Sequence, residues 1–167
     1  MIALNVQVVL IALVLASAWC DVRTRRIPNW LTVSGALCGL ALNVYEDGLP
    51  GALTSIAGLF SGLGIFMLLY LAGGMGAGDV KLFGAVGAMI GPGRLLIVFV
   101  LTGLLGGIAA VVLSLSRGRL GSAIQRTGEM LFDLGRLRMP QAREDAMRLP
   151  YGAVIAGGTL LSLFVTR

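Results

Sequence analysis

Long apolar runs alternate with short polar segments along almost the whole chain. The clearest run extends from about residue 52 to residue 71, a length that lets a helix cross a bilayer. The pattern predicts an all-α integral membrane protein with about six transmembrane helices in a single domain, residues 1–167. The expected spans are about 2–19, 30–44, 52–71, 82–90, 95–115 and 151–165.

Helix-breaking residues set the expected ends of these spans. Pro28 disfavours helical geometry at Ile27, so the first helix should have ended by that point. Glycine and proline predict turns at 46–50 and at 91–94. The run 82–90 is short, and runs of this length are more often re-entrant or buried in protein than exposed to lipid. The residues alone leave open whether it is a short or tilted span or one of these alternatives.

Charged residues indicate how the helices are oriented. If the N-terminus is outside, 11 of the 13 basic residues fall in inside loops, as the positive-inside rule requires. These are Arg23, Arg25, Arg26, Lys81, Arg117, Arg119, Arg126, Arg136, Arg138, Arg143 and Arg148. The same orientation places Asp21 and Asp79 together on the cytoplasmic side.

The composition supports a membrane protein and narrows its partners. Charged residues make up 13% of the chain, against about 25% in soluble domains, and the mean hydropathy is +0.92. The net charge of +5 comes mainly from arginines beside apolar runs, which indicates anionic lipid headgroups and not nucleic acid as the partner. Residues 116–149 have the pattern of a cytoplasmic amphipathic helix between the fifth and sixth spans. That helix either contacts substrate or is a solvated linker.

Several catalytic chemistries are absent from the sequence. The chain has no histidine, which excludes Ser-His-Asp and Cys-His catalysis and histidine metal sites. Its two cysteines, Cys20 and Cys38, form no CxxC pair and are expected to be packing residues. We therefore expect neither a metal nor a cofactor.

Two carboxylates remain as candidates for catalysis. Asp21 closes the first apolar run, and Asp79 follows a stretch with four glycines in six residues. Two carboxylates a few ångströms apart share a proton, so that one acts as general base on a water and the other as general acid on a peptide carbonyl. The structural alternatives are a helix N-cap for Asp79 and an ion pair with Arg23 or Arg25 for Asp21.

Three sequence motifs, two of which contain these carboxylates, resemble those of a known protein family. Residues 76–79 read GxGD, residues 21–29 read D-x-R-x-R-x-I-P-N, and residues 149–152 read L-P-Y-G at the start of the last span. In this order and on these spans, the chain resembles the type IV prepilin peptidases, which are GxGD membrane aspartic proteases. The resemblance covers essentially the whole chain.

The resemblance implies that Asp21 and Asp79 are catalytic. Such an enzyme lies in the bacterial inner membrane and cuts the basic leader from prepilins at the cytoplasmic face. Larger members add a domain with paired CxxC motifs and N-methylate the new terminus. The chain shows no room for that domain and no CxxC, so peptidase activity alone is expected. The small form resembles the branch that serves tight-adherence (Flp) pili.

Other residues of the motifs are candidates for substrate binding or for support of the site. Gly76 and Gly78 are expected to let the stretch 73–78 pair with the cleavage segment as an added strand. Arg23 and Lys81 either stabilise the carboxylates or merely follow the positive-inside rule. Pro150 is expected to be structural. Tyr151 is expected to anchor the last span at the interface, with substrate binding as the alternative.

Two other functions stay open at this stage. One is a different GxGD protease, of the preflagellin or signal peptide peptidase type, although the D-x-R-x-R-x-I-P-N stretch argues against it. The other is a non-catalytic membrane scaffold or transporter, in which Asp21 and Asp79 are structural or line an ion path. A transporter should show internal repeats and polar groups within its spans, and neither is evident. No pattern indicates an oligomeric state.

Overall fold

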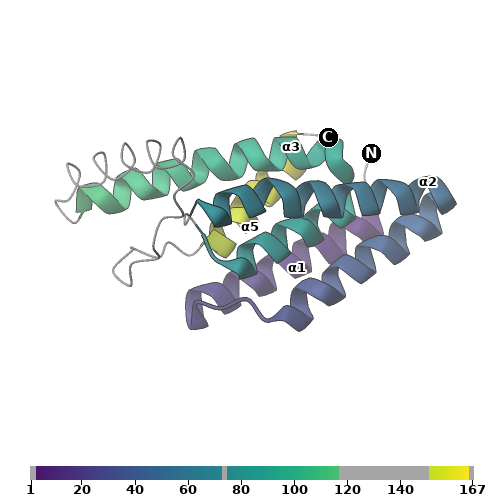
Figure 1. Ribbon diagram of the computed structural model, residues 1–167, viewed down its shortest axis with the longest axis horizontal. Coiled ribbons are helices and arrows are strands. Elements are labelled where there is room, and N and C mark those ends of the chain that lie inside the picture. Colours follow the sequence, from purple (N-terminus) through teal and green to yellow (C-terminus); the bar gives the residue numbers. More distant parts are fainter. Residues whose placement is uncertain (1–2, 73–74, 117–150, 166–167) are drawn as a thin grey trace.

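The computed structural model describes residues 3–72, 75–116 and 151–165, and in these residues all regular structure is helical. The helices are α1 (Leu4–Thr24), α2 (Asn29–Leu71), α3 (Ala77–Ser116) and α5 (Tyr151–Val165), as Figure 1 shows. By length and composition, α1, α2 and α3 are apolar enough to cross a membrane, and α5 is a shorter apolar helix. The all-α membrane class is thereby confirmed. The predicted amphipathic segment and Pro150 lie outside the described residues.

The two longest helices are each broken by one glycine. Gly48 in α2 has φ 62° and ψ −133°, and Gly91 in α3 has φ 75° and ψ 169°. Glycine adopts positive φ at little cost, and the prolines nearby, Pro50 and Pro92, cannot donate a helical hydrogen bond. The chain folds back at both breaks, so that each helix forms two antiparallel halves (Figure 1). Both breaks lie where the sequence predicts turns, while the number of segments that cross the bilayer stays a prediction.

The first helix is longer than the sequence predicted. It runs to Thr24, past the expected end at residue 19, so Asp21 lies on the helix and not in the loop that follows. Arg25 then ends the helix in a left-handed conformation, with φ 52°, and its N–H donates to the Asp21 carbonyl. Polar residues alone do not stop a helix, whereas Pro28 stops it from continuing, as predicted.

The first half of α3 forms the centre of the molecule. Every residue from 82 to 90 is buried, which shows that the short fourth run is a helix buried in protein. Its closest neighbour is the second half of α2, where the backbones of Gly58 and Gly87 touch: a Cβ built on either glycine would collide with the carbonyl oxygen of the other. Small residues allow such close approach between membrane helices. The Ser55 hydroxyl adds a 2.7 Å hydrogen bond to the Ala88 carbonyl.

An aromatic cluster fills the space between α2 and α3. Phe66 and Phe83 stack with ring centroids 3.8 Å apart, and Phe99 meets both rings edge to face at 6.2 and 6.3 Å. Phe83 lies one helical turn after Asp79, so this cluster packs next to the first turn of α3. The first turn of α3 is therefore supported by this tightly packed aromatic cluster.

Replacing Gly58 with alanine should destabilise the protein, because the added Cβ forces the α2 and α3 backbones apart. We expect the free energy of unfolding to fall by about 1–3 kcal/mol, as overpacking typically causes. Denaturation by SDS in mixed micelles measures it. Gly64→Ala is the matched control on the same helix, because its Cβ would meet nothing within 4 Å. Equal losses in the two variants would contradict the close contact.

Candidate active site

Three helix ends meet at one end of the molecule. The C-terminal end of α1, which carries Asp21, lies with the N-terminal ends of α3 and α5 (Figure 1). At the other end, Asn5 at the start of α1 donates a 2.6 Å hydrogen bond to Glu46, beside the break in α2. The structure thus brings Asp21 and Asp79 to the same end, as the loop charges predict.

Asp79 is held by the start of its own helix. Its Oδ2 accepts a 3.0 Å hydrogen bond from the Gly76 N–H, and its own N–H donates back to the Gly76 carbonyl at 3.1 Å. Because α3 begins at Ala77, Asp79 is its third residue and reaches back as in a capping box; it is not the N-cap. A Cβ on Gly76 would lie 3.2 Å from Asp79 Oδ2, so the missing side chain leaves room for this contact.

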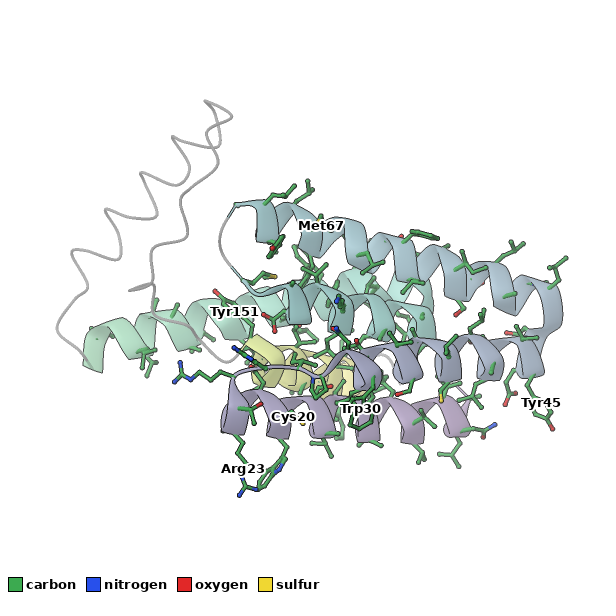
Figure 2. The ribbon with its side chains drawn as sticks, turned by 60° about the horizontal axis from the view of Figure 1, so that its bottom comes forward. Cys20, Arg23, Trp30, Tyr45, Met67 and Tyr151 are labelled. Carbon is green, nitrogen blue, oxygen red and sulfur yellow. The ribbon has the colours of Figure 1, made fainter. Side chains whose placement is uncertain are left out.

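Asp21 is held by a different helix. Its Oδ2 accepts a buried 2.8 Å hydrogen bond from the Gly152 N–H, in the first turn of α5. The first N–H groups of a helix have no partner within the helix, so they are available to an anion. The Arg23 guanidinium instead lies over the Trp19 ring, 5.7 Å from its centroid, and points away from α5 (Figure 2). The described contacts of Asp21 therefore favour the backbone of α5 over an ion pair with Arg23.

The two carboxylates share a sheltered environment. Asp21 and Asp79 are each only 7% exposed, and they lie close enough for their charges to interact. The phenol of Tyr151 also lies near Asp79. One oxygen of each carboxylate accepts a backbone N–H: Oδ2 of Asp79 from Gly76, and Oδ2 of Asp21 from Gly152.

The loop between α1 and α2 supports the start of α3. A Cβ on Gly78 would lie 3.3 Å from the Ile27 Cβ, so this glycine lets the loop pack against the helix. Lys81 Nζ donates a 2.9 Å hydrogen bond to Asn29 Oδ1, at the first residue of α2. Lys81 thus ties two helices together. The strand-pairing hypothesis is wrong for Gly78, since this residue is already helical in α3.

Three supporting residues were not identified as site residues from the sequence. Ile27, Asn29 and Gly152 all belong to motifs that the sequence shows, but their partners are distant along the chain. Nothing in their local pattern identifies those partners. Within the described residues, no group of three or more His, Cys, Asp or Glu side chains could hold a metal ion.

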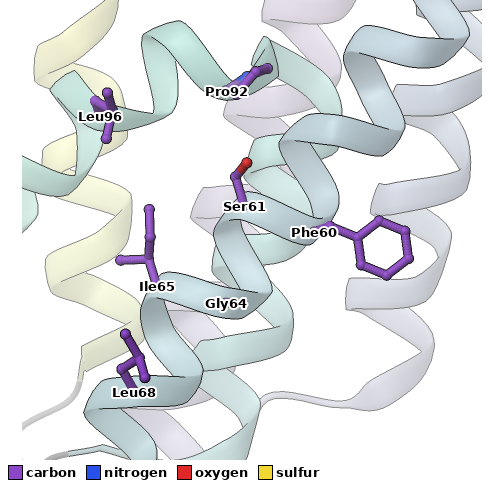
Figure 3. Close-up of a pocket in the computed structure, with 7 residues that line it drawn as sticks. All are labelled: Phe60, Ser61, Gly64, Ile65, Leu68, Pro92 and Leu96. Carbon is purple, nitrogen blue, oxygen red and sulfur yellow. The ribbon is translucent and has the colours of Figure 1, made fainter.

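An apolar pocket lies elsewhere on the molecule. It has a volume of about 500 Å³ and is lined by Phe60, Ser61, Gly64, Ile65, Leu68, Pro92 and Leu96, from α2 and α3 (Figure 3). None of these residues is titratable, so the pocket offers no acid or base. The candidate chemistry therefore lies at the two carboxylates and not in this pocket.

Comparison with known proteins places the chain in a family. Residues 8–111, well over half of the chain, match the model of the type IV leader peptidase family and include both aspartates. The chain is also 29% identical over 133 residues to the prepilin leader peptidase/N-methyltransferase of Neisseria gonorrhoeae. That match covers 74% of this chain and 46% of the relative, so the chain spans about half the length of the curated relative that it matches. No solved structure matches. Two sheltered aspartates at one end of an apolar helical protein, together with the family match, show that the chain belongs to the type IV leader peptidase family.

Proposed function

We propose that the chain is a membrane aspartic endopeptidase that removes the basic leader from type IV prepilins, with Asp21 and Asp79 as its catalytic pair. The observation that carries the proposal is the placement of these two carboxylates at the same end of the molecule, each sheltered and each held by a backbone N–H. Family membership supports the peptidase reaction, and the relative's name gives prepilin as the substrate class.

The proposed reaction uses the two carboxylates as a proton-sharing pair. The ionised carboxylate takes a proton from a water, whose oxygen forms a bond to the peptide carbonyl carbon. The protonated carboxylate gives its proton to the carbonyl oxygen, which becomes a hydroxyl of the tetrahedral intermediate. Collapse of the intermediate breaks the C–N bond: one hydroxyl gives its proton to the carboxylate that is now ionised as the carbonyl re-forms, and the leaving nitrogen receives a proton from the carboxyl that took it from the water. Since the pair titrates as a unit, neither Asp21 nor Asp79 is assigned the base role alone.

The substrate and its approach follow from the setting of the site. The proposed substrate is a prepilin of the Flp-like type, with a basic leader before an apolar helix. That helix would bind by lateral association within the bacterial inner membrane, while anionic headgroups attract the leader to the cytoplasmic face. The methyltransferase activity in the relative's name is not part of the proposal.

Neutralising either carboxylate should abolish cleavage. Asp21→Asn and Asp79→Asn keep the side-chain shape but cannot accept and donate the proton, so we expect cleavage rates to fall about 100- to 10,000-fold. The assay co-expresses the chain with a prepilin and measures the size of the product, at equal enzyme levels in the membrane. Asp47→Asn is the matched control, since Asp47 is exposed and lies beside the break in α2.

The assay also separates the alternatives. Normal cleavage by either active-site variant would show that the aspartate in question is structural. Intact prepilins with the unmodified chain, together with cleavage of a preflagellin or a signal peptide, would assign it to another GxGD protease function. A chain that cleaves none of these substrates would favour the scaffold or transporter function.

The proposed orientation has its own test. In a chain with Cys20 and Cys38 replaced by alanine, single cysteines are placed at Arg26 and Asp47, which are both exposed. A membrane-impermeant maleimide added to spheroplasts should label Asp47→Cys. It should label Arg26→Cys only after the membrane is permeabilised, because the site faces the cytoplasm. The reverse pattern would overturn the proposed orientation.

A further inference from the structure

We propose that Gly152 is a positioning residue, which holds the Asp21 carboxylate through its backbone N–H and leaves room for it by having no side chain. The proposal rests on the peptidase function proposed above. It assigns a task to α5, a helix that carries neither aspartate. Gly152 acts through Asp21 and does not itself touch the reacting bond.

The contact between Gly152 and Asp21 is close and specific. The hydrogen bond from the Gly152 N–H to Asp21 Oδ2 is 2.8 Å long and buried. A Cβ on Gly152 would lie 2.9 Å from both Oδ2 and Cβ of Asp21, and 3.1 Å from its Cγ. Real Cβ atoms essentially never come within 3.0 Å of another heavy atom, so any larger residue must displace the carboxylate or α5.

The position of Asp21 on its own helix explains why it needs this partner. Asp21 is close to the C-terminal end of α1, where the carbonyl groups carry a partial negative charge that disfavours a carboxylate. The N-terminal end of α5 carries the opposite partial charge, and its first N–H groups point toward an anion. The first turn of α5 thus supplies the N–H donors and the positive partial charge that the last turns of α1 lack.

The neighbouring residue links the same turn to the other carboxylate. Tyr151 directly precedes Gly152, and its phenol lies near the Asp79 carboxylate. Two consecutive residues of α5 therefore lie close to the two members of the pair, Gly152 in contact with Asp21 and Tyr151 near Asp79. The placement of α5 then sets where Asp21 stands relative to Asp79.

The rest of α5 is packed firmly enough to hold Gly152 in position. Ile155 and Ala156 are buried in the core. Farther along, Gly158 lies against Thr102 of α3, where an added Cβ would collide with the threonine hydroxyl. These contacts fix α5 against α3, which also carries Asp79. Through them, the positions of Gly152 and Asp79 are coupled.

The test compares Gly152→Ala with Gly157→Ala on the same helix. The control adds the same Cβ, but its nearest neighbour is Leu105 Cδ1 at 3.1 Å, the end of a flexible side chain. We expect Gly152→Ala to lower kcat for prepilin cleavage about 100-fold with KM changed less than threefold, because a misplaced carboxylate impairs the chemical step and not substrate binding. Gly157→Ala should keep kcat within about threefold of the unmodified chain, which must cleave the prepilin for the comparison to count.

A second measurement needs no activity. Thermal unfolding in detergent of Gly152→Ala, Asp21→Gly and the double variant forms a double-mutant cycle. If the Asp21 side chain is what Gly152 accommodates, Asp21→Gly should remove most of the loss in stability that Gly152→Ala causes. Additive losses, or a Gly152→Ala enzyme with normal kcat, would overturn the proposal. If Gly152→Ala does not accumulate, restored membrane levels in the double variant support it, and unrestored levels overturn it.

Discussion

Backbone N–H groups hold both carboxylates of the site. The packing of the helices places these N–H groups within hydrogen-bond distance of the carboxylates. Asp79 is held by Gly76 just before α3, and Asp21 by Gly152 in the first turn of α5. A backbone donor needs no charged side chain near the membrane, where such groups are costly. It does require that the carboxylate approach the backbone closely, and glycine stands at both donor positions, where an added Cβ would lie 3.2 Å (Gly76) or 2.9 Å (Gly152) from the carboxylate oxygen.

The same close approach recurs in the core that supports the site. The touching backbones of Gly58 and Gly87 bring the second half of α2 against the buried first half of α3. Phe66 and Phe83 then stack one turn below Asp79. Helix packing thus supports the site: glycines set the distances between helices, and aromatic rings fill the space that remains.

The sequence predicted the parts of this arrangement that depend on local chemistry. The breaks near Gly48 and Gly91 follow from glycine and proline, and loop charges placed Asp21 and Asp79 at one end. The apolar run predicted an end of the first span at about residue 19, which is too early for the helix, because α1 continues through polar residues to Thr24. The partner of Asp21 could not be predicted, since Gly152 lies 131 residues away and no local pattern encodes that contact.

The hydrogen bond between Asp21 and Gly152 has a consequence for biosynthesis. Asp21 is made early and enters the membrane with α1, but its partner is added only after translation has passed α2 and α3. A nascent chain that ends after Asp79 but before residue 152 therefore carries both aspartates without the helix that holds Asp21. The site takes the form described here only after α5 has been synthesised. A product truncated before α5 would contain the GxGD motif but would lack the hydrogen bond that holds Asp21.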